Sequence, residues 1–148
     1  MRSFLPILFA LAITLLAPLA RADVYVVVNA ANPVHAMAQK EVIDLYMGRS
    51  RAYASNELAL ALDLPRDHPV RAAFYNALTG LSAAQVNSYW ARLMFSGRTM
   101  PPQQVASEQA MEDLVRRNPG AIGYLAQEPA DHALRVVLVL KEHGGPAR

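Results

Sequence analysis

Cysteine is absent from the 148 residues of this chain. Without it there can be no disulfide framework, so the fold has to be stabilised by packing alone. Long apolar runs are absent as well, and none reaches the length that a membrane-spanning helix requires. We therefore expect a protein that is neither lipid-anchored through cysteine nor inserted in a membrane.

Sequence motifs for catalysis are also lacking. The chain contains no Gly-rich phosphate loop, no G-x-S-x-G turn and no H-E-x-x-H pair. Its four histidines are scattered without the spacing of metal ligands. No nucleophile stands beside a base in the sequence. The sequence predicts a protein that is not an enzyme and has no catalytic residues, cofactor or metal.

The first 22 residues have the pattern of an export signal. Arg2 supplies a positive start, residues 4–16 form a short apolar run, and Ala20-Arg21-Ala22 is an A-x-A cleavage site. We expect cleavage after Ala22, export to the periplasm, and a single domain over residues 23–148.

Loss of this signal would remove the positive net charge. The 14 lysines and arginines include Arg2 and Arg21, and the signal contains no acidic residue, so 12 basic residues remain against 12 acidic ones. A net charge of zero gives no support to binding of nucleic acid or of a membrane surface.

Apolar runs alternate with capped helical patterns along the rest of the chain. The first run, VYVVV at residues 24–28, is β-branched throughout, as in strands that are buried on both faces. The remaining expected strands are residues 58–64, 121–125 and 134–140, and helices are expected near residues 37–47, from Pro69 to Gly80, from Ser82 to Gly97 and from Ser107 to Arg117. This order predicts an α/β fold, a three-layer sandwich with a mostly parallel central sheet.

The helix after Ser82 has the most complete pattern. Ser82 and Gln85 have the spacing of a capping box, and Gly97 is placed to end the helix. One apolar face contains Val86, Tyr89, Trp90, Leu93 and Met94. Because Trp90 lies in the middle of this face, we expect the helix to pack against the sheet.

Two stretches carry residues suited to ligand binding. Arg66, Asp67, His68 and Arg71 surround the start of the helix at Pro69, where free N–H groups and the helix dipole can hold an anion. The alternative is that Asp67 or His68 only caps this helix and that the arginines are solvated.

Asn29 and Asn32 follow the first strand, at the end of a sheet where open α/β folds usually place ligands. The alternative there is ordinary turn chemistry.

The order of several patterns resembles a known family. "EVIDLYMGR", "VRAAFYNALTG", "SYWARLMFSGRTMPP" and "NPGAIGYL" resemble the short phosphate ABC-transporter substrate-binding proteins of proteobacteria, from about Val24 to Leu125. That family has a type II periplasmic-binding-protein fold with two lobes, and this chain has the length of about one lobe. The family's Ser-Gly-Thr segment is here replaced by His68-Pro69-Val70.

The resemblance implies a periplasmic solute-binding protein for phosphate or another small oxyanion. An ABC permease is an implied partner, and a second lobe or partner protein would complete the ligand clamp. The alternative is a ligand-free periplasmic interaction or signalling module that uses the same lobe as a scaffold.

Overall fold

The computed structural model describes residues 23–142, so the predicted export signal lies outside the described residues. Within them, five strands and four helices follow one another along the chain. The strands are β1 (Val24–Asn29), β2 (Leu60–Asp63), β3 (Gln103–Gln104), β4 (Ala121–Leu125) and β5 (Leu134–Leu140). The helices are α1 (Gln39–Tyr46), α2 (Pro69–Thr79), α3 (Ala83–Phe95) and α4 (Glu108–Arg117).

The strands form one mixed sheet in the order β3-β2-β4-β1-β5. β2 runs parallel to β3 and β4, whereas β1 runs antiparallel to both β4 and β5. The prediction of a mostly parallel sheet is therefore wrong. The apolar runs predict burial on both faces of the sheet. They do not indicate the direction of β1, which lies between β4 and β5.

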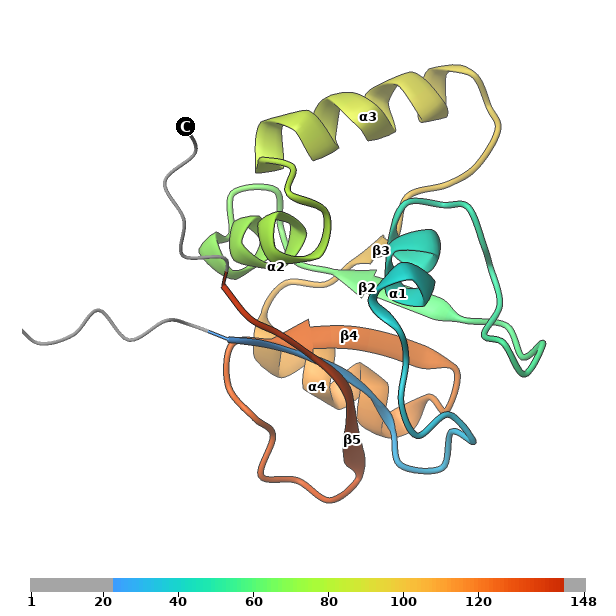
Figure 1. Ribbon diagram of the computed structural model, residues 1–148, viewed down its shortest axis with the longest axis vertical. Coiled ribbons are helices and arrows are strands. Elements are labelled where there is room, and N and C mark those ends of the chain that lie inside the picture. The colour runs from blue at the N-terminus through green and yellow to red at the C-terminus, as the bar shows by residue number, and fades with distance from the viewer. Residues whose placement is uncertain (1–22, 143–148) are drawn as a thin grey trace, which may run out of the picture.

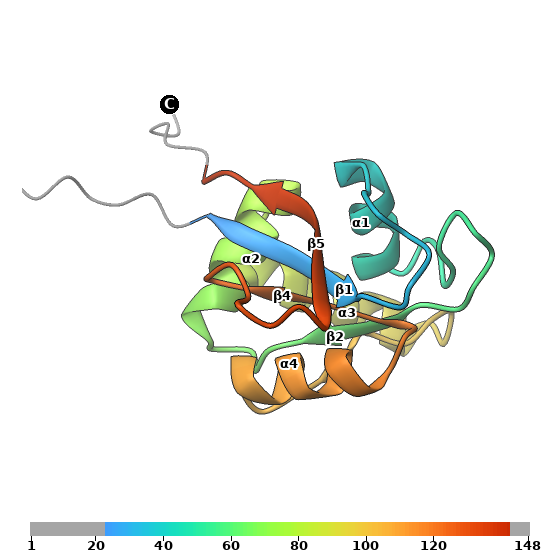
Figure 2. The ribbon, with the colours of Figure 1, turned by 90° about the horizontal axis from the view of Figure 1, so that it is seen from below.

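Helices cover both faces of this sheet. α1 and α2 lie on one face and α4 lies on the other (Figure 2). Val26, Val27 and Val28 in the centre of β1 are fully buried, as expected for a strand between two helical layers. The predicted three-layer α/β architecture is confirmed.

α3 begins and ends where the sequence predicts. Ser82 and Gln85 form the capping box, and Gly97 adopts φ +67° just after the helix. The helix lies beyond α2 instead of on the sheet (Figure 1), so that part of the prediction is wrong. Trp90 is buried all the same, because it packs on the turn at Gly48 that follows α1.

Three other elements differ in length from the prediction. The run at residues 58–64 forms a strand only from Leu60, because Leu58 is exposed and pairs with Ala52 in an isolated bridge. α1 starts at Gln39, two residues later than expected. No pattern in the sequence predicted β3, which consists of two exposed glutamines.

A substitution at Gly48 tests how closely Trp90 of α3 packs against the turn after α1. It has φ +75°, and a Cβ atom there would lie 2.7 Å from Cη2 of Trp90. We expect Gly48→Ala to lower the free energy of unfolding by about 2–4 kcal/mol, since strain at positive φ adds to overpacking.

Gly80 is the matched control, because it has φ +76° and no atom within 4 Å of the added Cβ. Gly80→Ala should cost only about 1–2 kcal/mol for the backbone strain. Equal losses in urea unfolding of the two variants would contradict the close contact with Trp90.

Across residues 23–142, no helix is long and apolar enough to cross a membrane.

Candidate functional site

A buried polar cluster lies at the carboxyl end of β2. Its centre is Asp63, the only acidic residue in an otherwise apolar strand. One carboxylate oxygen accepts hydrogen bonds from Arg71 Nε at 3.2 Å and from the Tyr75 hydroxyl at 2.8 Å. The other accepts from the Tyr124 hydroxyl at 2.5 Å and from the Leu64 N–H at 2.9 Å. Both oxygens of Asp63 are therefore fully used within the fold.

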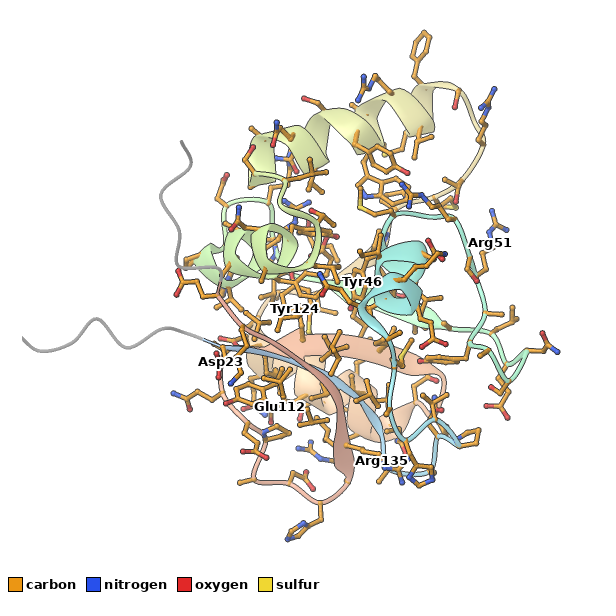
Figure 3. The ribbon with its side chains drawn as sticks, in the orientation of Figure 1. Asp23, Tyr46, Arg51, Glu112, Tyr124 and Arg135 are labelled. Carbon is orange, nitrogen blue, oxygen red and sulfur yellow. The ribbon has the colours of Figure 1, made fainter. Side chains whose placement is uncertain are left out.

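The two tyrosines of this cluster remain protonated at neutral pH. Burial raises the pKa of Tyr75 and Tyr124 well above the usual value, and the nearby charge of Asp63 raises both further. Tyr124 lies beside Tyr46 between the helices α1 and α2 and the sheet (Figure 3). Both hydroxyls donate to Asp63, and that of Tyr124 also accepts from the Leu64 N–H at 3.2 Å.

Arg71 has donors to spare. Its side chain is 6% exposed and is paired with Asp63 through Nε alone, while its guanidinium carbon lies 5.0 Å from the centre of the Tyr75 ring. Nη1 of Arg71 and Nε1 of Trp90 are the two buried side-chain nitrogen or oxygen atoms, within residues 23–142, that have no hydrogen-bond partner. Unsatisfied buried donors are rare in folded proteins and need an explanation.

Both donors belong to residues that line one pocket of about 340 Å³. It lies between the end of β2, the start of α2, the helix α3 and residues 101–104. Its lining consists of Asp63, Leu64, Arg66, Arg71, Asn87, Trp90, Ala91, Met94, Pro101, Pro102 and Gln104. The volume is within the range of small-molecule sites.

The structure brings together only part of the predicted site. Arg66 and Arg71 both line the pocket. His68 caps α2 instead, since its Nδ1 accepts from the Val70 N–H at 3.2 Å. Asp67 is exposed and lies outside the lining.

The start of α2 offers little to an anion. Pro69 has no N–H, and the N–H of Val70 is bonded to His68 Nδ1. The N–H groups of Arg71 and Ala72 both donate to the carbonyl oxygen of His68, at 3.1 and 3.3 Å. The free N–H groups that the sequence suggested at this helix are thus already occupied.

Asn29 and Asn32 lie at the other end of the sheet, because β1 runs opposite to β2 and β4. The side-chain amide of Asn29 donates to the carbonyl oxygens of Val115 and Arg116, and that of Asn32 donates to Pro119. Each side-chain oxygen accepts from the backbone N–H two residues further on. The contacts of the side-chain oxygens are the turn chemistry of the alternative interpretation, whereas the amide groups connect the turn to residues 115–119.

Sequence reasoning missed Asp63 and gave Trp90 only a packing role. A signal for Asp63 was present, since a carboxylate inside an apolar strand requires a buried partner, and Arg71 follows eight residues later. No local pattern indicated that Trp90 would line the same pocket, because that depends on how α3 sits against α2.

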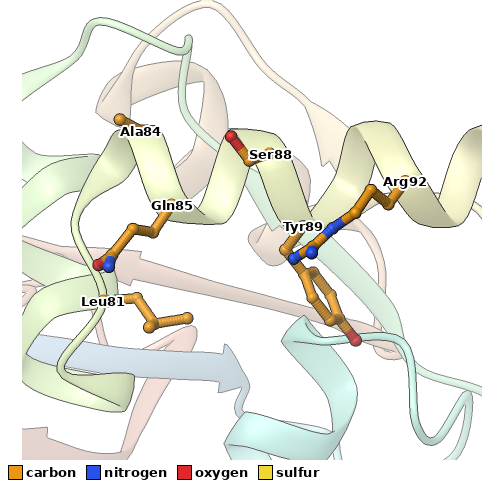
Figure 4. Close-up of a pocket in the computed structure, with 6 residues that line it drawn as sticks. All are labelled: Leu81, Ala84, Gln85, Ser88, Tyr89 and Arg92. Atoms are coloured by element: carbon orange, nitrogen blue, oxygen red, sulfur yellow. The ribbon is translucent and has the colours of Figure 1, made fainter.

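A second hollow of about 360 Å³ lies along α3 (Figure 4). Its lining includes Arg92, but two of its other polar side chains are used elsewhere: Gln85 belongs to the capping box, and Tyr89 donates to the carbonyl oxygen of Met47 at 2.6 Å. The remaining polar side chain, Ser88, is exposed. No buried unpartnered atom belongs to this hollow among the described residues. It is a weaker candidate than the pocket at Arg71.

No group of three or more histidine, aspartate or glutamate side chains within residues 23–142 is placed to hold a metal ion.

Two solved structures share this fold. One is described as a phosphate ABC transporter substrate-binding protein with bound phosphate from Clostridium perfringens, with a TM-score of 0.62 and 19% identity over 78% of this chain and 45% of that one. The other is an ABC-type phosphate transport receptor from Vibrio cholerae, with a TM-score of 0.59 and 18% identity over 78% of this chain and 46% of that one. The sequence matches no protein-family model and no curated protein.

This chain thus spans less than half the length of either protein. Such coverage fits a single lobe of a periplasmic-binding-protein-like fold. The fold implied by the sequence resemblance is confirmed.

Proposed function

We propose that this protein is a non-enzymatic solute-binding protein that binds a small oxyanion in the pocket at Arg71. The observation that carries the proposal is the pair of buried donors without acceptors, Nη1 of Arg71 and Nε1 of Trp90, on residues that line one pocket. Bound oxyanion oxygens would satisfy both donors.

The charges around the pocket favour an anion. Asp63 is neutralised by Arg71, and both of its oxygens are occupied by donors. Arg66 is exposed at the pocket and has no ion pair within the described residues. The uncompensated charge of the lining is therefore positive.

Access to the buried donors requires a small movement. Neither nitrogen is open to solvent in this structure. Met94 lines the same pocket, and its flexible side chain is exposed and can move aside. Arg66 is then the first contact of an arriving anion, and Arg71 and Trp90 hold it afterwards.

Fluorescence titration of the purified protein with phosphate and sulfate tests this function. Trp90 is the only tryptophan, so its emission reports on the pocket directly. We expect a saturable change in emission and a rise in melting temperature with anion concentration, because binding to the native state stabilises it. Arg66→Ala should weaken binding about 10-fold or more, as loss of a charged hydrogen bond costs about 1.5–3 kcal/mol.

Arg92→Ala is the matched control, since Arg92 lies on the same helix as Trp90 but lines the other hollow. Its affinity should equal that of the unaltered protein. Unchanged emission and melting temperature at millimolar phosphate, sulfate and phosphonate would exclude the proposed function.

We also propose that the protein works in the periplasm and delivers the anion to an ABC permease. The signal-like residues 1–22 and the fold shared with two phosphate transport proteins support it. The other half of each of those proteins has no counterpart in the matched region, so a second lobe or partner protein would complete the clamp over the ligand.

A ligand-free interaction module is the second candidate, and exposed apolar side chains favour it. Phe95 is 97% exposed at the end of α3, and Leu58 and Met100 are exposed along a groove of about 700 Å³. Leu58 and Met100 share this groove, and exposed apolar groups that gather in this way mark interaction surfaces. If a Phe95→Ser/Met100→Ser double variant binds anions with unchanged affinity, these exposed apolar side chains are not part of the anion pocket.

A further inference from the structure

We propose that the ligand of the Arg71 pocket is an organic anion with an apolar substituent, such as an alkylphosphonate, rather than free inorganic phosphate. This inference rests on the proposed function and names the ligand class of the same pocket. It follows from the residues that line the pocket, of which some carry hydrogen-bond donors and others are apolar.

The side-chain hydrogen-bond donors of the lining come from five of its eleven residues. Hydroxyl side chains are absent from it, and the first N–H groups of α2 are occupied or missing. The remaining donors are the side chains of Arg66, Arg71, Trp90, Asn87 and Gln104. Inorganic phosphate carries acceptor oxygens on every side, and each acceptor buried without a partner costs about 1–3 kcal/mol.

The rest of the lining is apolar. Leu64, Ala91, Met94, Pro101 and Pro102 complete it, and none of these side chains can donate a hydrogen bond. An oxyanion group at the guanidinium of Arg71 would therefore share the pocket with these five apolar side chains. An apolar substituent placed there is removed from water and needs no donor.

Met94 is the side chain best placed to respond to such a substituent. It is exposed at the pocket, although it lies on the predicted apolar face of α3. An apolar group in the pocket would cover it, and the polarizable thioether adapts to groups of different shape. An apolar substituent in the pocket would therefore lie against the side chain of Met94.

A homologous series of ligands provides the test. Methyl-, ethyl-, propyl- and butylphosphonate have the same anionic group and differ only in methylenes. We expect affinity, measured by the emission of Trp90, to rise about fourfold for each methylene that is buried, or about 60-fold across the series. Inorganic phosphate should bind more weakly than butylphosphonate.

Two variants separate the apolar subsite from the anion site. Met94→Ser should reduce the gain in affinity for each added methylene. Arg66→Ala should weaken all members of the series by the same factor. Met100→Ser is the control, because Met100 is exposed but does not line this pocket.

The outcomes distinguish the two proposals. Equal affinities for phosphate and all four phosphonates would overturn this inference and leave anion binding standing. A rise along the series that Met94→Ser does not alter would place the substituent outside the pocket and would also overturn it. Failure of every anion to bind would remove the proposed function itself.

Discussion

The Asp63→Ala variant is expected to lose about 3–5 kcal/mol of its free energy of unfolding, the cost of leaving a buried charge without its partner. Arg71 is almost fully buried, and Asp63 is the only carboxylate that pairs with it among the described residues. The hydroxyls of Tyr75 and Tyr124 would lose their acceptor in the same step. Chemical unfolding in urea, followed by circular dichroism, measures the loss.

The effect of the charge can be isolated with two further variants. Asp63→Ala/Arg71→Met removes both charges, so its loss should be smaller than the sum of the two single losses. Asp67→Ala removes an exposed carboxylate four residues away and should change stability by less than about 0.5 kcal/mol. A loss below about 1 kcal/mol in Asp63→Ala would contradict a buried ion pair at this position.

Asp63 also links the stability of the fold to the proposed binding. It bonds only Nε of Arg71, so the guanidinium is anchored while Nη1 keeps a donor without an acceptor. An arginine anchored in this way loses little conformational freedom when it binds an anion. The same carboxylate that stabilises the fold thus holds Arg71 in place for the proposed ligand.

Local patterns predicted the elements of this fold well. The capping box of Ser82 and Gln85, the cap at Ser107 and the left-handed Gly97 all depend on a few neighbouring residues. The direction of β1 could not be predicted in the same way, because it depends on which strands lie on either side. The position of α3 could not be predicted either, because an apolar face indicates that a helix is buried but not which element it packs against.

Of the six residues predicted to bind a ligand, two line the pocket at Arg71. Arg66 and Arg71 are near each other in sequence, so a local pattern was sufficient to place them together. Asn29 and Asn32 were added on the assumption that strand ends meet at one edge, which holds only for parallel strands. Because β1 is antiparallel to its neighbours, these two residues lie at the opposite edge from Arg66.

Phe74→Ala is expected to reduce the free energy of unfolding by about 3–5 kcal/mol, the usual cost of deleting a buried aromatic ring. Phe74 is fully buried, and its ring stacks on Tyr124 with 3.8 Å between the centres. Tyr46 and Tyr75 pack edge-on against the same ring, at 4.7 and 5.0 Å. Three surrounding rings cannot all move into the cavity, so little of the loss would be recovered by relaxation.

Phe95→Ala is the matched control for this variant, because the same atoms are removed from a side chain that is 97% exposed. It should change stability by less than about 0.5 kcal/mol. Phe74→Leu should lose less than Phe74→Ala, since it fills part of the cavity. Because Tyr124 both stacks on Phe74 and donates to Asp63, Phe74→Ala should also weaken anion binding, whereas Phe95→Ala should not. Unfolding in urea and the emission of Trp90 measure these two effects separately, and equal losses at Phe74 and Phe95 would contradict the aromatic core described here.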